Sequence, residues 1–396
     1  MYQASAQRQR VLIFLPCFTH GGAEKQGALL ARYLRDEGCD VEVWGFPSLA
    51  ASAPLKATLR SWGIMHHELP AWPSLDWNFS KLPMSRWRLA QQYYRWPQQI
   101  RTLAATMPAR QFDVVVPFTN MPCVASVLMK RRWGARKVVW NHRGGFEGGI
   151  DFTEFLVKTI LKQRPVFAAN TNVGADFLRH TFGLMPDRVH VIRNTFTPDF
   201  DEDERALSSI KRSSSSISLV HVANFFSEKD GETVIRAMGM LKSNAVRCHL
   251  HLVGHFPYKN YRKILDEAVG AFQVQDNVTF HGALDRHRVH VLLRQADVGL
   301  LSSKSEGMPN SVMEYMYWRL PVIATDIPGI REVVGEGNAD WLFKVGDAAH
   351  LSTLIERLSR DEEMRKQLGV ANRRRIVQHF GAEKTLPQWK QVIGIK

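Results

Sequence analysis

Residues 297–334 alternate strand, loop, helix and strand signals in a pattern that favours a parallel α/β sheet. Val298–Leu301 is a short apolar run bounded by polar residues, which is typical of a buried strand, and Pro321–Thr325 is expected to be a second buried strand. A loop containing glycine and proline separates them, and a helix is expected over 312–318. The loop is therefore predicted at the carboxyl end of a strand, where open α/β sheets bind ligands.

Two glutamates mark this loop and helix. Glu306 lies on the loop, and Glu314 lies about one turn into the helix, after the expected capping residues Asn310 and Ser311. A helix N-terminus offers unpaired N–H groups and partial positive charge, which suit a phosphate. Glu314 is placed to accept hydrogen bonds from a diol such as ribose, and Glu306 to face the group attached to the phosphate. The alternative is two solvent-exposed carboxylates.

The residues around the two glutamates carry a family resemblance. Glu306-Gly307-Met308-Pro309-Asn310, then Glu314, then Leu320–Asp326 and Pro328-Gly329 resemble the donor-site signature of the family-four retaining glycosyltransferases. These are GT-B enzymes of bacterial glycan biosynthesis, and the resemblance continues to about residue 390. It implies two Rossmann-like, doubly wound domains that face each other across a cleft. It also implies a donor site made of Gly307, Met308, Pro309, Asn310, Ser311 and Glu314.

The same resemblance implies a mechanism. Glu306 would hold sugar hydroxyls and offset positive charge on the ring, and the acceptor's proton would pass to the leaving phosphate. No metal would be required. Lys229 matches the family's diphosphate-binding lysine, whereas Asn224 stands where relatives often carry an arginine, which is a departure. Charge neutralisation would then depend more on Lys229 and on helix termini.

Two stretches of the first half are also candidates for the site. Gly21 and Gly22 form a turn between an expected strand and helix, and they resemble the family's glycine loop that approaches the donor phosphates. His142 is expected at the carboxyl end of a strand, placed to orient a donor hydroxyl or to assist the acceptor. The alternative for Gly21 and Gly22 is a turn without a binding role, and the alternative for His142 is a histidine that is hydrogen-bonded within a turn. The predicted catalytic residues are Glu306, Lys229 and His142.

The chain divides at an acidic and serine-rich stretch. We predict an acceptor-side domain over 1–198, a linker over 199–216 and a nucleotide-sugar donor domain over 217–380. A C-terminal helix at about 381–396 is expected to return to the first domain. The Asp-x-Asp spacings in the linker are interpreted as a solvated run rather than as a metal site; they involve Asp199, Asp201 and Asp203.

Residues 72–108 interleave aromatic and basic side chains. We predict that this segment contacts a membrane surface or the acceptor through Arg86, Trp87, Arg88, Arg95 and Trp96. Packing of the rings into the domain core and stacking on single-stranded nucleic acid are the alternatives.

Composition limits the remaining choices. The formal net charge is +14, and residues 1–198 supply most of it with 25 basic and 13 acidic side chains, which favours an anionic partner. The four cysteines are scattered without metal-site spacing, and no signal peptide or membrane-spanning run is evident. These features favour a cytoplasmic protein, peripheral on the inner face of the plasma membrane.

The sequence thus predicts a metal-independent, retaining glycosyltransferase of the hexosyl type. Its donor would be a UDP- or GDP-linked sugar and its acceptor a glycan or a lipid-linked glycan of polysaccharide biosynthesis. A GT-B-like nucleotide-sugar epimerase is one alternative. A basic protein that binds nucleic acid or an anionic surface without transferase activity is the other. The sequence does not specify the sugar, the base, the acceptor or the oligomeric state.

Overall fold

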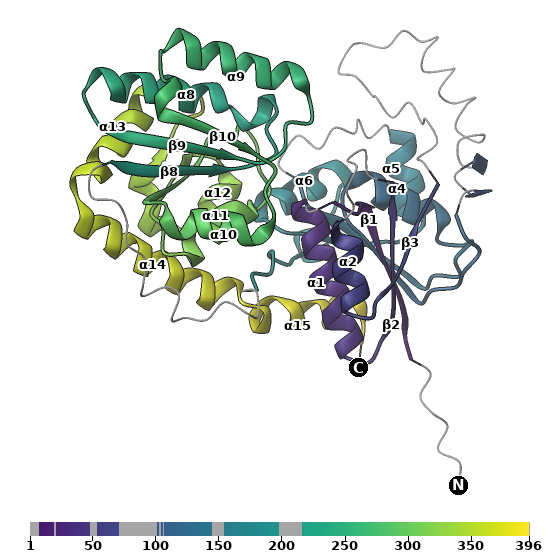
Figure 1. The fold of residues 1–396 in the computed structure, drawn as a ribbon. Helices are drawn as coiled ribbons and strands as arrows, with labels where there is room; N and C mark the ends of the chain where they lie inside the picture. Colours follow the sequence, from purple (N-terminus) through teal and green to yellow (C-terminus); the bar gives the residue numbers. More distant parts are fainter. Residues whose placement is uncertain are drawn as a thin grey trace. The chain divides into compact units, whose positions relative to one another are not determined.

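The computed structural model of the 396-residue chain describes residues 8–19, 21–47, 54–70, 101–102, 104–105, 107–144, 154–197 and 216–395. The chain forms two compact units, each with its own parallel sheet (Figure 1). Unit 1 consists of Met1–Thr195 and Thr385–Lys396, and unit 2 consists of Phe196–Lys384. The predicted membrane residues Arg86, Trp87, Arg88, Arg95 and Trp96 lie outside the described residues, as do Asp199, Asp201 and Asp203.

Unit 1 is built on a parallel sheet that, within the described ranges, has seven strands in the order β3-β2-β1-β4-β5-β6-β7. Strand β1, which lies between β2 and β4, is almost entirely apolar and mostly buried, as expected for a sheet covered on both faces. The strands are β1 (Arg10–Cys17), β2 (Asp40–Phe46), β3 (Met65–Glu68), β4 (Val114–Pro117), β5 (Lys137–His142), β6 (Val166–Ala169) and β7 (Val189–Val191).

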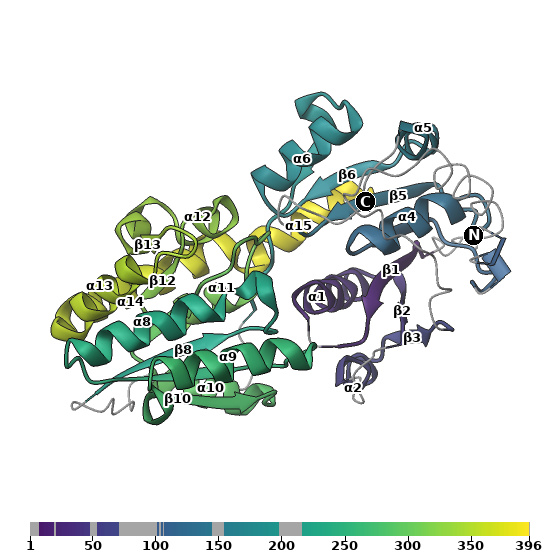
Figure 2. The same ribbon diagram turned by 90° about the horizontal axis from the view of Figure 1, so that it is seen from above.

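Helices cover both faces of this sheet (Figure 2). The main core of unit 1 lies under α4, α5 and α6, which contribute apolar side chains to it. On the other face, Gly27 of α1 packs so closely on Leu15 of β1 that a Cβ there would lie 2.3 Å from the leucine side chain. The helices are α1 (Gly22–Asp36), α2 (Pro54–Ser61), α4 (Asn120–Met129), α5 (Glu154–Lys162), α6 (Asn172–Phe182), the 3-10 turn η1 (Pro186–Arg188) and α15 (Ala382–Ile393).

Helix α15 completes unit 1 from the far end of the chain. The Thr385 and Thr195 hydroxyls are 2.7 Å apart, and the Lys137 ammonium donates to the carbonyls of Val392 and Ile393 at 2.9 Å each. These contacts attach α15 to the sheet at β5 and at the segment after β7.

Unit 2 has a second parallel sheet, with six strands among the described residues in the order β10-β9-β8-β11-β12-β13. One core lies between the sheet and α8, α9 and α13, and another between the sheet and α10, α11, α12 and α14. The strands are β8 (Ile217–Val222), β9 (Cys248–Val253), β10 (Val278–Gly282), β11 (Val298–Leu301), β12 (Val322–Thr325) and β13 (Leu342–Phe343). The helices and 3-10 turns are η2 (Ser227–Lys229), α8 (Gly231–Ser243), α9 (Lys259–Ala271), η3 (Gln275–Asn277), α10 (Arg286–Gln295), α11 (Asn310–Tyr317), α12 (Pro328–Val334), η4 (Glu336–Trp341), α13 (Ala348–Arg360) and α14 (Glu362–Phe380).

The predicted fold class of two doubly wound Rossmann-like domains is confirmed, with one local correction at the site. Helix α11 begins at Asn310, with Pro309 as its N-cap residue, so Asn310 and Ser311 occupy its first turn and do not cap it. The proline ring fixes φ and holds the chain extended immediately before the helix. Among the described residues no helix combines the length and the apolar character that a membrane span requires.

Candidate functional site

The loop that carries Glu306 is fixed to the sheet by buried hydroxyl groups. Ser302 and Ser303 directly follow β11 and are fully buried. The Ser302 hydroxyl donates to the Lys229 carbonyl at 2.7 Å, and the Thr325 hydroxyl donates to the Ser303 carbonyl at 2.6 Å. The loop is therefore tied to the ends of two neighbouring segments, which holds its backbone in one position. These residues were not predicted from the sequence, although small hydroxyl side chains directly after a buried strand were a usable signal.

Lys229 and Glu306, predicted to act on the diphosphate and on the sugar, form an ion pair. Their side chains are only 17% and 14% exposed, and the Ser303 hydroxyl donates to the same Glu306 carboxylate at 2.6 Å. Lys229 ends η2, so the turn after β8 and the loop after β11 bring the two charges together. The arrangement places one cation and one anion at the carboxyl edge of the unit 2 sheet.

Glu314 lies in α11 beside a buried tyrosine. The Val222 amide of β8 donates to the Tyr315 hydroxyl at 2.6 Å, and Tyr315 is fully buried. Burial raises the pKa of Tyr315, and the negative charges of Glu314 and Glu306 add to that rise, so both carboxylates are near the phenol. Gly299 makes room for the ring, because a Cβ at that position would lie 2.4 Å from it. The structure thus brings Lys229, Glu306 and Glu314 to one region of unit 2.

The backbone of the loop is also packed against α12. A Cβ on Gly329 would lie 1.9 Å from the Gly307 carbonyl oxygen and 2.4 Å from that of Glu306. Gly307, Met308 and Pro309 are all buried, and the Met308 side chain belongs to the core. The Met308 side chain is therefore not available to a ligand, and Pro309 has no backbone N–H to donate. Asn310 and Ser311 are partly buried in the first turn of α11.

Two residues near the end of β8 differ in environment. Asn224, at the position where relatives often carry an arginine, is exposed. His221, on β8, is fully buried, and burial together with the positive charge of Lys229 lowers the pKa of His221 to about 3. His221 is thus neutral at physiological pH, and Lys229 remains the cation of this turn.

The predicted glycine turn in unit 1 begins α1. Gly21 is the N-cap residue, and the buried Glu24 carboxylate folds back over it, so that a Cβ on Gly21 would lie 2.1 Å from a Glu24 oxygen. The Cys17 thiol donates to this carboxylate at 3.2 Å, and burial raises the pKa of Glu24. A phosphate approaching Gly21 and Gly22 would therefore meet Glu24 beside the amides of the helix.

His142 ends β5, at the carboxyl edge of the unit 1 sheet, as predicted. Its side chain is buried, and its ring stacks on Phe177 with the centroids 4.9 Å apart. A role for His142 on the donor or the acceptor stays a prediction. The adjacent Arg143, which sequence analysis did not single out, lies at the same edge.

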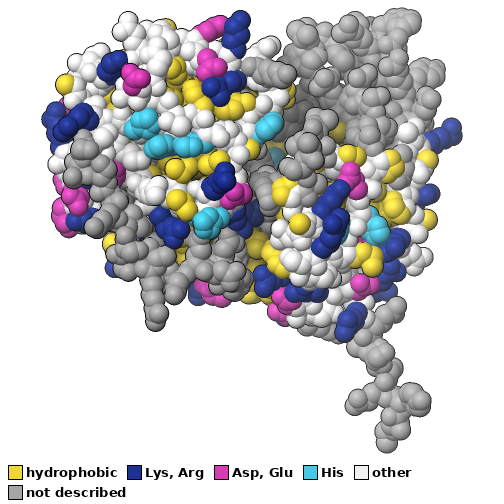
Figure 3. Space-filling model, in the orientation of Figure 1, with side chains coloured by type: hydrophobic (Ala, Val, Ile, Leu, Met, Phe, Trp, Pro, Cys, Tyr) yellow, Lys and Arg dark blue, Asp and Glu magenta, His cyan; other side chains and the backbone are white. Residues whose placement is uncertain are grey.

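Metal ligands do not gather in the described part of the chain, which holds no group of three His, Cys, Asp or Glu side chains arranged for a metal ion. Histidines are nevertheless visible on the surface of unit 2 (Figure 3). His251 Nδ1 and His281 Nε2 are 3.0 Å apart, and burial together with His249 and His281 lowers the pKa of His251 to about 4. These rings on β9 and β10 hydrogen-bond each other as neutral side chains.

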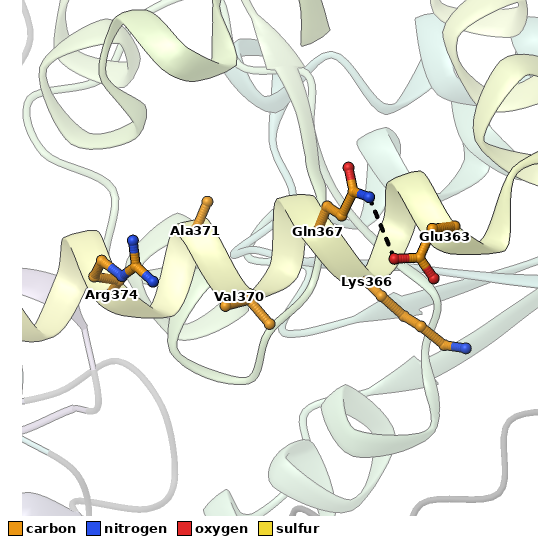
Figure 4. Close-up of a pocket in the computed structure, with 6 residues that line it drawn as sticks. All are labelled: Glu363, Lys366, Gln367, Val370, Ala371 and Arg374. Atoms are coloured by element: carbon orange, nitrogen blue, oxygen red, sulfur yellow. Dashed lines mark hydrogen bonds between the residues drawn. The ribbon is translucent and has the colours of Figure 1, made fainter.

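Two surface hollows lie apart from the glutamate loop. The first runs along α14 alone and contains none of the predicted site residues (Figure 4). The second, of about 390 Å³, lies in unit 1 at the ends of α4 and α5. It is lined by Lys130, Arg131, Gly134, Ala135, Lys162, Gln163 and Arg164.

Comparison with known proteins identifies the two halves of the chain separately. A model described as "Glycosyltransferase Family 4" matches residues 20–200, and one described as "Glycosyl transferases group 1" matches residues 203–375. Over 174 residues the chain is 30% identical to N-acetyl-alpha-D-glucosaminyl L-malate synthase of Bacillus anthracis, covering 44% of each chain. Over 210 residues it is 28% identical to a putative colanic acid biosynthesis glycosyltransferase of Salmonella typhimurium, covering 51% of this chain and 50% of that protein.

The chain thus spans about half the length of these curated relatives. Its fold is similar to solved structures over nearly its whole length. Anabaena HepE in complex with UDP and glucose has a TM-score of 0.73 at 17% identity, covering 97% of this chain and 99% of HepE. S. aureus TarM in complex with Fondaparinux, alpha-GlcNAc-glycerol and UDP has a TM-score of 0.70 at 10% identity, covering 97% and 99%.

Proposed function

The chain belongs to the group 1 glycosyltransferases of the GT-B fold, and on that premise we propose that it transfers a sugar from a nucleoside-diphosphate sugar to a glycan acceptor with retention of configuration. The observation that carries the proposal is the pairing of Lys229 with Glu306 beside Glu314 and the first turn of α11. A cation, a sugar-facing carboxylate, a ribose-facing carboxylate and a helix N-terminus are what a nucleotide sugar requires.

Departure of the diphosphate is the step that needs the most electrostatic help. The Lys229 ammonium and the backbone amides of Gly307, Met308, Asn310 and Ser311 would stabilise the developing negative charge, because preorganised donors act strongly in a site that excludes water. The N-terminus of α11 adds partial positive charge. These groups supply the charge that a metal would otherwise provide, so we propose that none is needed.

The two carboxylates have different tasks in this proposal. Glu306 would accept hydrogen bonds from sugar hydroxyls and stabilise positive charge on the ring as the bond to the diphosphate lengthens. Glu314 would accept hydrogen bonds from the ribose. The acceptor's proton would pass to the departing phosphate, so no residue of the chain is assigned as a base. His142 would orient the donor or the acceptor.

The substrates follow in part from the relatives. HepE has been solved with UDP-glucose, and two relatives are named for colanic acid biosynthesis, so we propose a UDP-linked hexose and a role in polysaccharide biosynthesis, with GDP as the second choice of nucleotide. A lipid-linked glycan is one of the acceptors that we propose. We also propose that the protein lies in the cytoplasm, at the membrane surface.

Donor binding tests the function directly. Thermal shift with UDP, GDP and their sugars in EDTA should give saturable stabilisation by one nucleotide, of about 2.7 kcal/mol at a hundred times its Kd. Glu314→Ala should lose this stabilisation, whereas Glu363→Ala, a change on the exposed face of α14, should keep it. If no nucleotide stabilises the wild-type protein at millimolar concentration, the transferase proposal fails and the anionic-surface alternative gains.

We also propose that the basic hollow of unit 1 contacts anionic lipid. Lys130, Arg131, Lys162 and Arg164 line it with no carboxylate among the lining residues, and burial and the charge of Arg164 lower the pKa of Lys130, which reflects cations crowded together. A cluster of basic side chains attracts phosphate headgroups, and each basic residue near the membrane surface contributes about 1 kcal/mol to the binding free energy.

Vesicle sedimentation tests this contact. Wild-type protein should bind phosphatidylglycerol vesicles but not neutral phosphatidylcholine vesicles, and salt should weaken the binding. The double variant Arg131→Glu and Lys162→Glu should lose most of it. The control Lys263→Glu and Lys366→Glu changes the net charge equally in unit 2 and should bind normally. Equal loss in both double variants would mean that only net charge matters and would rule out a specific hollow.

A further inference from the structure

Arg143 occupies an unusual environment at the carboxyl edge of the unit 1 sheet. It directly follows β5, is partly buried, and has its guanidinium carbon 5.1 Å from the ring centroid of Phe118 and 5.4 Å from that of Trp389. Its Nε donates to Asn141 Oδ1 at 2.8 Å and its Nη1 donates to Asn194 Oδ1 at 2.6 Å. Residues from β5, from after β4 and β7, and from α15 thus hold the side chain in one orientation.

The charge of Arg143 is not balanced within the described residues. None of their ion pairs includes Arg143, and both of the hydrogen-bond acceptors above are neutral amide oxygens. Burial lowers the pKa of Arg143 to about 9, so the group is desolvated but still cationic at neutral pH. A desolvated cation is costly unless an anion accompanies it, because amide dipoles only partly replace water.

The neighbouring backbone adds to the positive potential. Phe118 pairs with Asn141 by a parallel bridge, and the next residue, Thr119, has a φ of 72°. A β-branched residue rarely adopts this left-handed region, and strain of this kind is concentrated at functional sites. Thr119 is the N-cap residue of α4 but makes no capping hydrogen bond with its side chain. The positive end of α4 therefore begins two residues along the chain from the ring that contacts Arg143.

We propose that Arg143 binds an oxyanion, a carboxylate or a phosphoryl group, that is carried by the acceptor. This inference rests on the proposed function, because it assumes that unit 1 binds the acceptor of a transferase. A guanidinium has about five N–H donors in a planar fork, and the hydrogen bonds to the Asn141 and Asn194 side chains leave some of them for a ligand. The fork fits two oxygens of one anion. The acceptor would thus be an acidic sugar, a sugar phosphate or a similar anion rather than a neutral glycan.

The first test measures anion binding to the full chain by calorimetry in Tris–chloride. Inorganic phosphate and succinate are the probes, and glycerol is the neutral control. Wild-type protein should bind one or both anions saturably at millimolar concentration. Arg143→Met should weaken that binding at least tenfold, because a hydrogen bond to a charged group is lost. Arg357→Met removes an arginine that stacks on Trp341 in unit 2 and should leave binding unchanged.

A second variant separates ligand binding from a structural role. Asn194→Asp places a carboxylate against Nη1, so the protein acquires its own counter-ion. Binding of phosphate and succinate should then fall at least tenfold although the melting temperature does not fall. A purely structural arginine would predict unchanged anion affinity in Asn194→Asp. Either that result or the absence of saturable binding to the wild-type protein would overturn the proposal.

Binding of the donor nucleotide, measured on the same variants, separates this inference from the proposed function. Arg143→Met and Asn194→Asp should both bind the donor nucleotide as the wild-type protein does, since Arg143 belongs to unit 1 and the donor residues to unit 2. Anion binding without any nucleotide binding would contradict the transferase but leave an anion site at Arg143. Nucleotide binding without anion binding would support the transferase and overturn the anion site at Arg143.

Discussion

At the scale of single residues, the central feature is that Lys229 and Glu306 are each other's ion-pair partner. Both are mostly buried, and Ser303 donates a further hydrogen bond to Glu306. Removing one charge from such a pair leaves the other poorly solvated, so the two side chains hold each other in place. A donor whose diphosphate contacts Lys229 and whose sugar contacts Glu306 would enter between charges that are already positioned.

Glu306→Gln tests the charge while it keeps the shape. The amide oxygen can still accept from Ser303 and Lys229, but the mostly buried Lys229 loses its counter-ion, so the melting temperature should fall while the protein stays folded. Sugar transfer should fall by about 10²–10³-fold, the scale for losing one preorganised electrostatic contact. The measurement is kcat with the nucleotide sugar that the binding screen selects. Glu228→Gln, a change in an exposed neighbour of Lys229, serves as the control, and near-normal turnover in Glu306→Gln would reject the assigned role.

At the scale of elements, strands were easier to predict than helix boundaries. Strand β11 has the predicted bounds Val298–Leu301, and β12 covers Val322–Thr325 where Pro321–Thr325 was predicted, whereas α11 covers Asn310–Tyr317 where 312–318 was predicted. Near the end of unit 2, α13 ends at Arg360 and α14 runs unbroken through Gly369. A Cβ on Gly369 would lie 2.1 Å from the Arg319 carbonyl oxygen, so this glycine permits close packing and does not end a helix.

The boundary between α13 and α14 has a local signal in the sequence. Asp361 caps α14 by accepting from the Met364 amide at 2.8 Å, and two glutamates follow it in the first turn. The start of α11 had no comparable side-chain signal, since Pro309 precedes it and makes no capping bond. Close backbone approaches such as those at Gly369 and Gly329 depend on residues far apart in the sequence, and a single sequence does not reveal them.

Gly329→Ala tests the packing of α12 on the glutamate loop. The added methyl group would meet the Gly307 and Glu306 carbonyl oxygens, so the loop or the helix must shift. We expect a loss of about 1–3 kcal/mol in the free energy of unfolding, the usual cost of overpacking, together with weaker nucleotide binding. Denaturant unfolding measures the first. Gly270→Ala in α9 has open space around its Cβ and should be neutral or slightly stabilising; equal stability of the two variants would contradict the packing argument.

At the scale of the whole molecule, the sequence was sufficient for the fold class, whereas the roles assigned to the residues of the Glu306 loop stay predictions. Alternating strands and helices imply parallel sheets, and the motif from Glu306 to Gly329 carries its own family resemblance. The environment of Arg143 was not predictable, because Phe118, Asn194 and Trp389 come from separate parts of the chain. Neither was the Lys229–Glu306 pair, which requires the ends of β8 and β11 to be neighbours.

The return of α15 to unit 1 has a consequence for synthesis. A ribosome makes residues 385–396 only after all of unit 2, so unit 1 is the first unit to emerge and the second to be completed. Throughout the translation of unit 2, Arg143 has Phe118, Asn141 and Asn194 but not Trp389, and Lys137 lacks the carbonyls of Val392 and Ile393. The proposed oxyanion site at Arg143 can therefore be completed only on a chain whose unit 2 has already been made.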